Sequence, residues 1–122
     1  MLAQGIWHFI QNEKSKKNDT YSILKKFYQS FFSDMYNELN IGRYRQIRDA
    51  IGLVINKFVA NDHPMAYASK LVLYIQARCV KSRLKLTKEQ QLYLRQLEDN
   101  TKHVNVNYVY SGPIDSIEQF AV

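Results

Sequence analysis

The chain has 122 residues and a formal net charge of +6, with 46% hydrophobic and 23% charged residues. This profile is typical of one globular domain and excludes a disordered chain. With only four glycines and two prolines, the sequence favours long helices over a turn-rich β fold. The positive charge favours anionic partners, such as nucleic acid or the inner leaflet of a membrane.

A single cysteine, Cys79, excludes an internal disulfide and a thiolate metal cage, and it fits a reducing compartment. Residues 1–10 are apolar but short, interrupted by polar residues and preceded by no positive charge, so they do not indicate a signal peptide. No uncharged apolar run is long enough to span a bilayer. We therefore expect a cytoplasmic protein, with peripheral contact at the inner membrane surface left open.

Residues 1–18 are expected to form an arm outside the main fold. They combine hydrophobic side chains, including Trp7, Phe9 and Ile10, with a lysine cluster over residues 14–17. Such a segment can anchor at an anionic leaflet or pack against the protein. Its irregular amphipathicity favours packing.

The first predicted helix opens at one of three capping residues, Asn18, Asp19 or Thr20. Hydrophobic residues then recur at steps of three and four. They are Ile23, Leu24, Phe27, Tyr28, Phe31, Met35 and Leu39. Residues 40–42 are expected to end this helix.

A second apolar stripe covers residues 44–59, and the pattern breaks over residues 61–64. Pro64 suits the first turn of a third helix, because its missing N–H group is no loss there. Asp62 or His63 is expected at the cap. The third stripe extends over residues 65–83.

Thr87 and Gln90 have the spacing of a capping box and predict the start of a fourth, shorter helix. Connections of about three to six residues make consecutive helices antiparallel. The predicted fold class is therefore all-α: an up-down-up-down four-helix bundle with an N-terminal arm and a C-terminal tail. We expect one domain, with the bundle over residues 19–100 and the tail over residues 101–122.

Nine tyrosines are an unusual number for this length. Tyr28 and Tyr44 lie on apolar stripes and are expected in the core. Tyr108 and Tyr110 lie in the tail, and a tyrosine offers large contact area with a polar tip, which suits interfaces. Two interpretations stay open: the tail docks on the bundle, or it docks and also recognises a partner. A short helical turn is predicted over residues 114–120.

Nothing in the sequence indicates catalysis. The four glycines are far apart, the three histidines have no ligand partner one helical turn away, and Glu98 and Asp99 point apart on a helix. We expect no catalytic or metal site, no cofactor and no small-molecule substrate.

The basic stretch over residues 78–88 is either a solvated helix end or a functional surface. It supports an alternative function, a small basic helical regulator that binds nucleic acid. No helix-turn-helix or aromatic RNA-binding signature accompanies it, and the fourth helix is mixed in charge. We therefore expect no nucleic-acid partner.

Three runs in the second half of the chain are specific: Leu71–Ile75, Ser82–Thr87 and Gln90–Leu97. Together with residues 104–110 and 118–120, they resemble the immunity proteins of pediocin-like (class IIa) bacteriocins, and in particular the enterocin A immunity family. The resemblance covers residues 19 to 110.

The resemblance implies a four-helix bundle that protects the producing cell from its own antimicrobial peptide. Such proteins act from the cytosol on the bacteriocin–receptor complex, whose receptor is the membrane permease of the mannose phosphotransferase system. The C-terminal half of the family carries the specificity for the peptide. Carried over here, this points to the following partner-binding residues: Lys81, Arg83, Lys85, Arg95, Val106, Tyr108 and Tyr110.

Overall fold

The computed structural model describes residues 2–33, 35–37, 39–107, 109 and 112–121, without the side chains of residues 2–5, 7 and 8. These residues form four α-helices, two short 3-10 helices and no strand. The elements are α1 (Leu2–Gln29), η1 (Ser30–Phe32), α2 (Ile41–Ala60), α3 (Pro64–Ser82), α4 (Lys88–Thr101) and η2 (Ile117–Phe120).

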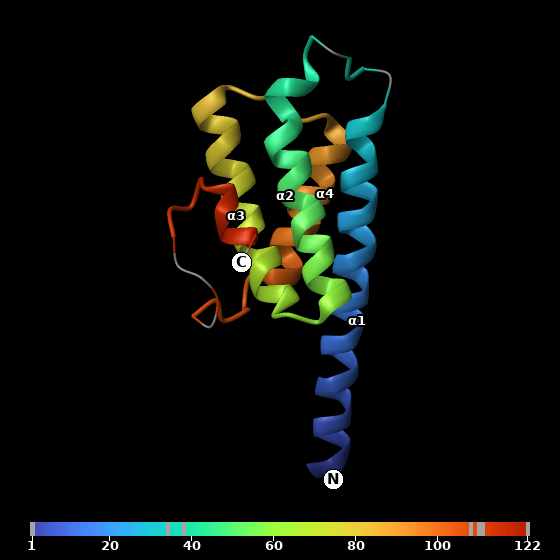
Figure 1. The fold of residues 1–122 in the computed structure, drawn as a ribbon. Helices are drawn as coiled ribbons and strands as arrows, with labels where there is room; N and C mark the ends of the chain where they lie inside the picture. Colours follow the sequence, from blue (N-terminus) through green and yellow to red (C-terminus); the bar gives the residue numbers. More distant parts are fainter. Residues whose placement is uncertain (1, 34, 38, 108, 110–111, 122) are drawn as a thin grey trace.

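The four α-helices alternate in direction along the chain (Figure 1). Each helix packs against the next one in sequence, and α4 returns to lie beside α1. The predicted all-α, up-down-up-down four-helix bundle is therefore confirmed. None of the described helices is long and apolar enough to cross a membrane.

The core lies along the bundle axis and draws on all four helices. Its largest fully buried hydrophobic side chains are Leu24, Phe27, Phe31, Ile47, Ile51, Leu71, Tyr74, Ile75, Leu97 and Phe120. Each contributes roughly 1.5–3 kcal/mol through burial of apolar surface. Tyr44, as predicted from its stripe, packs against this core, with its ring 5.3 Å from that of Tyr36.

The predicted start of the first helix at Asn18, Asp19 or Thr20 is wrong, because α1 already begins at Leu2. The polar residues expected at the cap make other contacts. The Thr20 hydroxyl donates to the Lys16 carbonyl one turn back, and Asp19 Oδ2 accepts from Asn100 Nδ2 at 2.9 Å. Asn100 Nδ2 also donates to Thr20 Oγ1 at 3.2 Å, so both side chains join α1 to α4 instead of starting a helix.

The first helix also ends earlier than predicted. Gln29 is the last residue of α1, and Phe31 is buried in η1, whereas Met35 and Leu39 are exposed in the loop to α2. Side-chain amides hold this loop, since Asn40 Nδ2 donates to the Met35 carbonyl at 2.8 Å. Residues 41 and 42 belong to α2 and do not terminate a helix.

The predicted boundaries between the second, third and fourth helices are close to the observed ones. Pro64 occupies the first turn of α3, and His63 is its N-cap residue, although its side chain makes no capping hydrogen bond. The capping box of α4 is confirmed: Thr87 Oγ1 accepts from the Gln90 backbone N–H at 3.1 Å, and Gln90 Oε1 accepts from the Thr87 N–H at 3.0 Å. Val59, the last residue of the predicted second stripe, is exposed.

The tail returns along the bundle and docks against α2 and α3 (Figure 1). Phe120 in η2 is 1% exposed, and its ring lies 5.4 Å from that of Tyr74 and 6.5 Å from that of Tyr67. Gln119 is also buried, and its side-chain amide donates to the Ile114 carbonyl at 2.8 Å. The helical turn predicted near the C-terminus is therefore present.

The arm is helical and projects past the other helices as the first part of α1 (Figure 1). We predicted that the apolar residues of the arm pack against the bundle, and for the described side chains this prediction is wrong. Phe9 is 65% exposed, and Ile6 and Ile10 are exposed as well, because this part of α1 projects past the ends of the other helices. The predicted role of Trp7 falls on a side chain outside the described residues.

Candidate interaction surface

A groove of about 520 Å³ runs between the end of α3 and the start of α4. Its lining is mostly apolar and consists of Gln76, Cys79, Val80, Leu84, Lys85, Leu86, Gln91 and Leu94. Leu84 is buried and anchors the floor, whereas Val80 is 82% exposed at the rim. An exposed aliphatic side chain beside a hollow can bury apolar surface only against another molecule.

The α3–α4 connection is held in place by the first turn of α2. Arg43 Nη2 donates to the Ser82 carbonyl at 3.0 Å, and the Tyr44 hydroxyl donates to the Lys85 carbonyl at 3.1 Å. Arg83 caps α3 in the left-handed conformation, with φ of 52°, and its N–H donates to the Cys79 carbonyl. The basic side chains of this connection are therefore displayed from a fixed backbone.

The four cations predicted as partner-binding residues are all exposed near this groove. Lys85 lines it, and Arg95 follows the lining residue Leu94 on α4. Lys81 and Arg83 lie on either side of the last residue of α3. The structure thus brings Lys81, Arg83 and Lys85 to the α3–α4 connection, whereas Arg95 lies midway along α4.

The predicted tail residues lie elsewhere. Val106 is half-buried and packs against the core, and Val109 is buried. Tyr108 and Tyr110 lie outside the described residues. For the described part of the tail, docking on the bundle is observed, and its role in recognition stays a prediction.

A salt bridge connects the tail to the basic end of α3. Lys81 Nζ lies 2.9 Å from Asp115 Oδ2, between two side chains that are both partly exposed. The hydrogen bond from Lys81 and its positive charge lower the pKa of the Asp115 carboxyl. The pair fixes one side of the candidate surface to the docked tail.

Sequence reasoning missed the apolar floor of the groove and the cations that α2 adds. The first turns of α2 supply the exposed residues Arg43 and Arg45 at the same end of the bundle, far from residue 81 in sequence. One signal was available: Val80 lies off the buried stripe of α3, where a polar residue is usual.

Burial of the half-buried Cys79 raises the pKa of its thiol, which disfavours a reactive thiolate.

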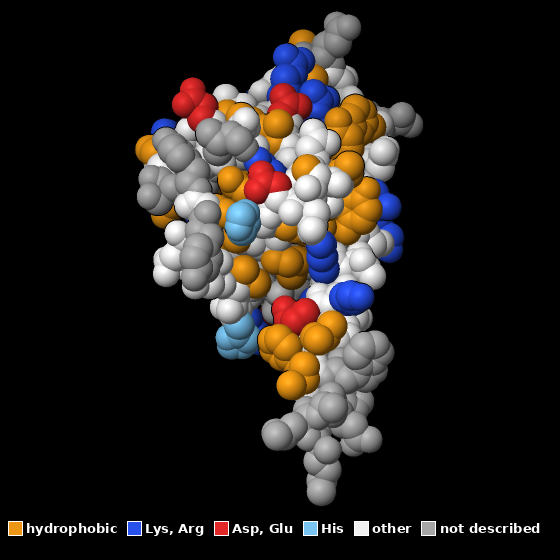
Figure 2. Space-filling model, turned by 60° about the horizontal axis from the view of Figure 1, so that its bottom comes forward, with side chains coloured by type: hydrophobic (Ala, Val, Ile, Leu, Met, Phe, Trp, Pro, Cys, Tyr) orange, Lys and Arg blue, Asp and Glu red, His pale blue; other side chains and the backbone are white. Residues whose placement is uncertain are grey.

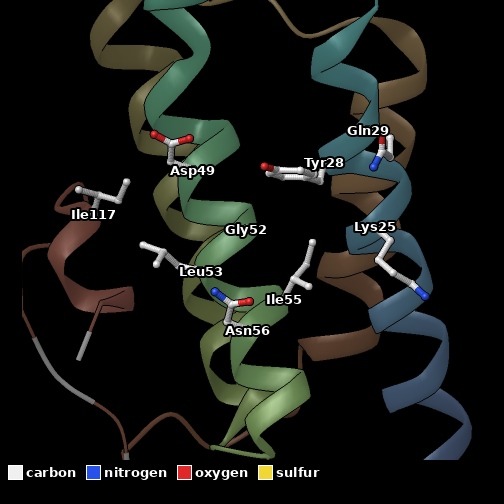
Figure 3. A pocket seen from close by; sticks show the side chains of 9 residues that line it. All are labelled: Lys25, Tyr28, Gln29, Asp49, Gly52, Leu53, Ile55, Asn56 and Ile117. Atoms are coloured by element: carbon white, nitrogen blue, oxygen red, sulfur yellow. The ribbon is translucent and has the colours of Figure 1, made fainter.

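A second hollow, of about 710 Å³, lies between α1 and α2 (Figure 3). Tyr28 reaches from α1 toward α2 at the level of Gly52, where an added Cβ would lie 3.2 Å from the Tyr28 ring. Lys25 and Asp49 give its rim charges of both signs. It contains none of the predicted partner-binding residues. The described part of the chain holds no group of three or more metal-ligating side chains.

The fold and this surface define an antiparallel helical bundle with one basic, grooved end. Residues 16–102, which include all of α2, α3 and α4 and most of α1, match the sequence model of the bacteriocin immunity protein family. The chain therefore belongs to this family, and specifically to its enterocin A immunity branch. No curated protein and no solved structure matches the chain. The assignment favours an immunity role over the nucleic-acid alternative, in a family not known for catalysis.

Proposed function

We propose that this protein protects its producing cell by binding, from the cytosol, the complex of a pediocin-like bacteriocin with the mannose phosphotransferase permease. The family match over residues 16–102 carries the immunity role. The receptor and the side of the membrane come from the resemblance to class IIa immunity proteins.

The α3–α4 groove supports a binding mechanism. A peptide-bound receptor that exposes an apolar segment can bury it against Val80 and Leu86, while acidic groups beside that segment meet Lys85 and Arg83. Binding then favours the receptor state that fits the groove, because a ligand shifts an equilibrium only through its different affinities for two states.

Expression of the chain in a bacteriocin-sensitive strain tests the immunity role. Cells that carry the gene are expected to survive one or more of a panel of pediocin-like peptides that kill cells with the empty vector. If no member of the panel is tolerated while the protein accumulates in folded form, the immunity role is refuted.

A groove variant tests the site itself. Val80→Asp places a charge on an exposed side chain, so the fold should persist. The tolerated peptide concentration should fall at least tenfold, because an unpaired charge in an apolar contact costs more than about 1.4 kcal/mol. Val59→Asp is the matched control, since Val59 is 72% exposed on α2 and lies outside the groove. Equal protection by both variants would remove the groove from the proposal.

A further inference from the structure

The projecting part of α1 is an unpartnered continuation of the face that α1 buries in the bundle. Steps of three and four residues connect this segment with the buried face of α1 through two charged residues, Glu13 and Lys17. The apolar positions before them are Ile6, Phe9 and Ile10, and the positions after them are Thr20, Leu24 and Phe27. The later residues are buried, whereas Ile6 and Phe9 are 61% and 65% exposed. The family match begins at residue 16, so this apolar segment lies outside it.

Lysines border this apolar stripe on both sides. Lys14 lies one turn beyond Ile10, and Lys16 lies two turns beyond Phe9, so they flank the stripe where it approaches the bundle. Figure 2 shows hydrophobic side chains at this end of the molecule, with an acidic side chain beside them and Lys or Arg side chains close by. Glu13 is the one acidic residue of the segment 13–17, whose three lysines leave it with a net charge of +2.

A hollow of about 380 Å³ extends the apolar surface at the root of the projecting segment. Pro64 and Met65 at the start of α3 and Val104 after α4 form its apolar wall, and Lys14 and Lys17 lie at its edge together with Glu13 and His63. Lys17 Nζ also donates to Asn61 Oδ1 at 2.5 Å and so fixes the root to the α2–α3 turn. Apolar side chains, with two lysines, Glu13 and His63 at their edge, therefore continue from the segment onto the body of the protein.

We propose that residues 6–17 are a membrane-surface anchor whose apolar stripe enters an anionic bilayer. The charges select this occupant, because lysine ammonium groups reach anionic headgroups while their methylene stems and the stripe face the acyl chains. Each lysine at an anionic surface and each buried apolar side chain adds to the affinity. A second copy of the chain on the same stripe would bring like charges together.

Vesicle binding of the full chain tests the anchor, and Trp7 provides the signal because it is the only tryptophan. With vesicles that contain about one third anionic lipid, its emission is expected to shift to the blue and the protein to float with the vesicles. Binding should weaken as salt rises, and vesicles of zwitterionic lipid alone should bind weakly. No permease is present, so failure here would leave the proposed immunity role standing, and failure of protection would leave the anchor standing.

Two pairs of variants locate the contact. Ile6→Ser with Phe9→Ser should lower the affinity by about tenfold per side chain. The control, Met35→Ser with Leu39→Ser, alters side chains that are 56% and 92% exposed in the α1–α2 loop and should have no effect.

Lys14→Gln with Lys16→Gln should lower the affinity by about fivefold per lysine. The control, Lys25→Gln with Lys26→Gln, removes the same charge further along α1 and should change the affinity for the vesicles less than twofold. The anchor is refuted if neither vesicle type binds, if the arm and control variants bind equally, or if the same apolar variant instead abolishes self-association in sedimentation.

Discussion

Gln90 shows how one polar side chain organises the grooved end of the bundle. It is fully buried, and besides closing the capping box of α4 its Nε2 lies 3.1 Å from Ser30 Oγ and 2.8 Å from the Tyr36 hydroxyl. The spacing between Thr87 and Gln90 predicts the capping role of Gln90 from the sequence. The partners before α2 could not be predicted, because they lie more than 50 residues away and depend on the fold.

Gln90→Ala should lower the free energy of unfolding by about 2–4 kcal/mol, because it removes a cap and leaves buried polar groups without partners. Chemical denaturation measures this change. Gln96→Ala is the control, since Gln96 is exposed on the same helix and its loss should cost under about 0.5 kcal/mol. Similar losses for the two variants would contradict the role of Gln90.

The pairing of Asp115 with Lys81 makes the tail contact sensitive to pH. Because the folded-state pKa of Asp115 is lowered, the pair contributes above the ordinary carboxyl pKa and is lost as pH falls through the lowered value. In Lys81→Met, the Asp115 pKa measured by carboxyl NMR titration should rise toward its ordinary value. In Lys85→Met it should stay unchanged, and an equal rise in both variants would show that the specific pair is not the cause.

At the scale of elements, periodicity predicted the number, order and direction of the helices, and α2, α3 and α4 lie close to their expected positions. It failed for α1 at both ends. Thr20 has the chemistry of a cap but accepts a hydrogen bond from Asn100 of α4, and Leu39 fits the spacing of a stripe but lies in a loop. Tertiary contacts decide where such a helix begins and ends, and a local sequence pattern carries no information about those contacts.

The docked tail predicts a large contribution from Phe120. Phe120→Ala should cost about 3–5 kcal/mol in unfolding free energy, because it empties a buried site beside Tyr67 and Tyr74. Thermal and denaturant unfolding measure it, with Ile114→Ala as the control at an exposed tail position. Removing the tail is therefore a poor test of recognition, because the loss of Phe120 alone would weaken the fold.

At the scale of the whole molecule, two surfaces lie at opposite ends of the bundle (Figure 1). The α3–α4 groove and its cations lie at one end, and the projecting part of α1 lies at the other. Lys81, Arg83 and Lys85 were predictable because they cluster in sequence, whereas Arg43 and Arg45 of α2 were not. The groove could not be predicted, because it forms only where two helices approach each other. The exposure of the helical arm could not be predicted either, because it depends on where the other helices end.

The most direct test of the central claim is isolation of the tagged protein from membranes of sensitive cells, with and without a bacteriocin that it neutralises. We expect the permease to be captured only when the peptide is present, and capture to fall in Val80→Asp but not in Val59→Asp. Protection that persists with no capture of the permease, or capture that is equal with and without the peptide, would contradict recognition of the bacteriocin-bound receptor.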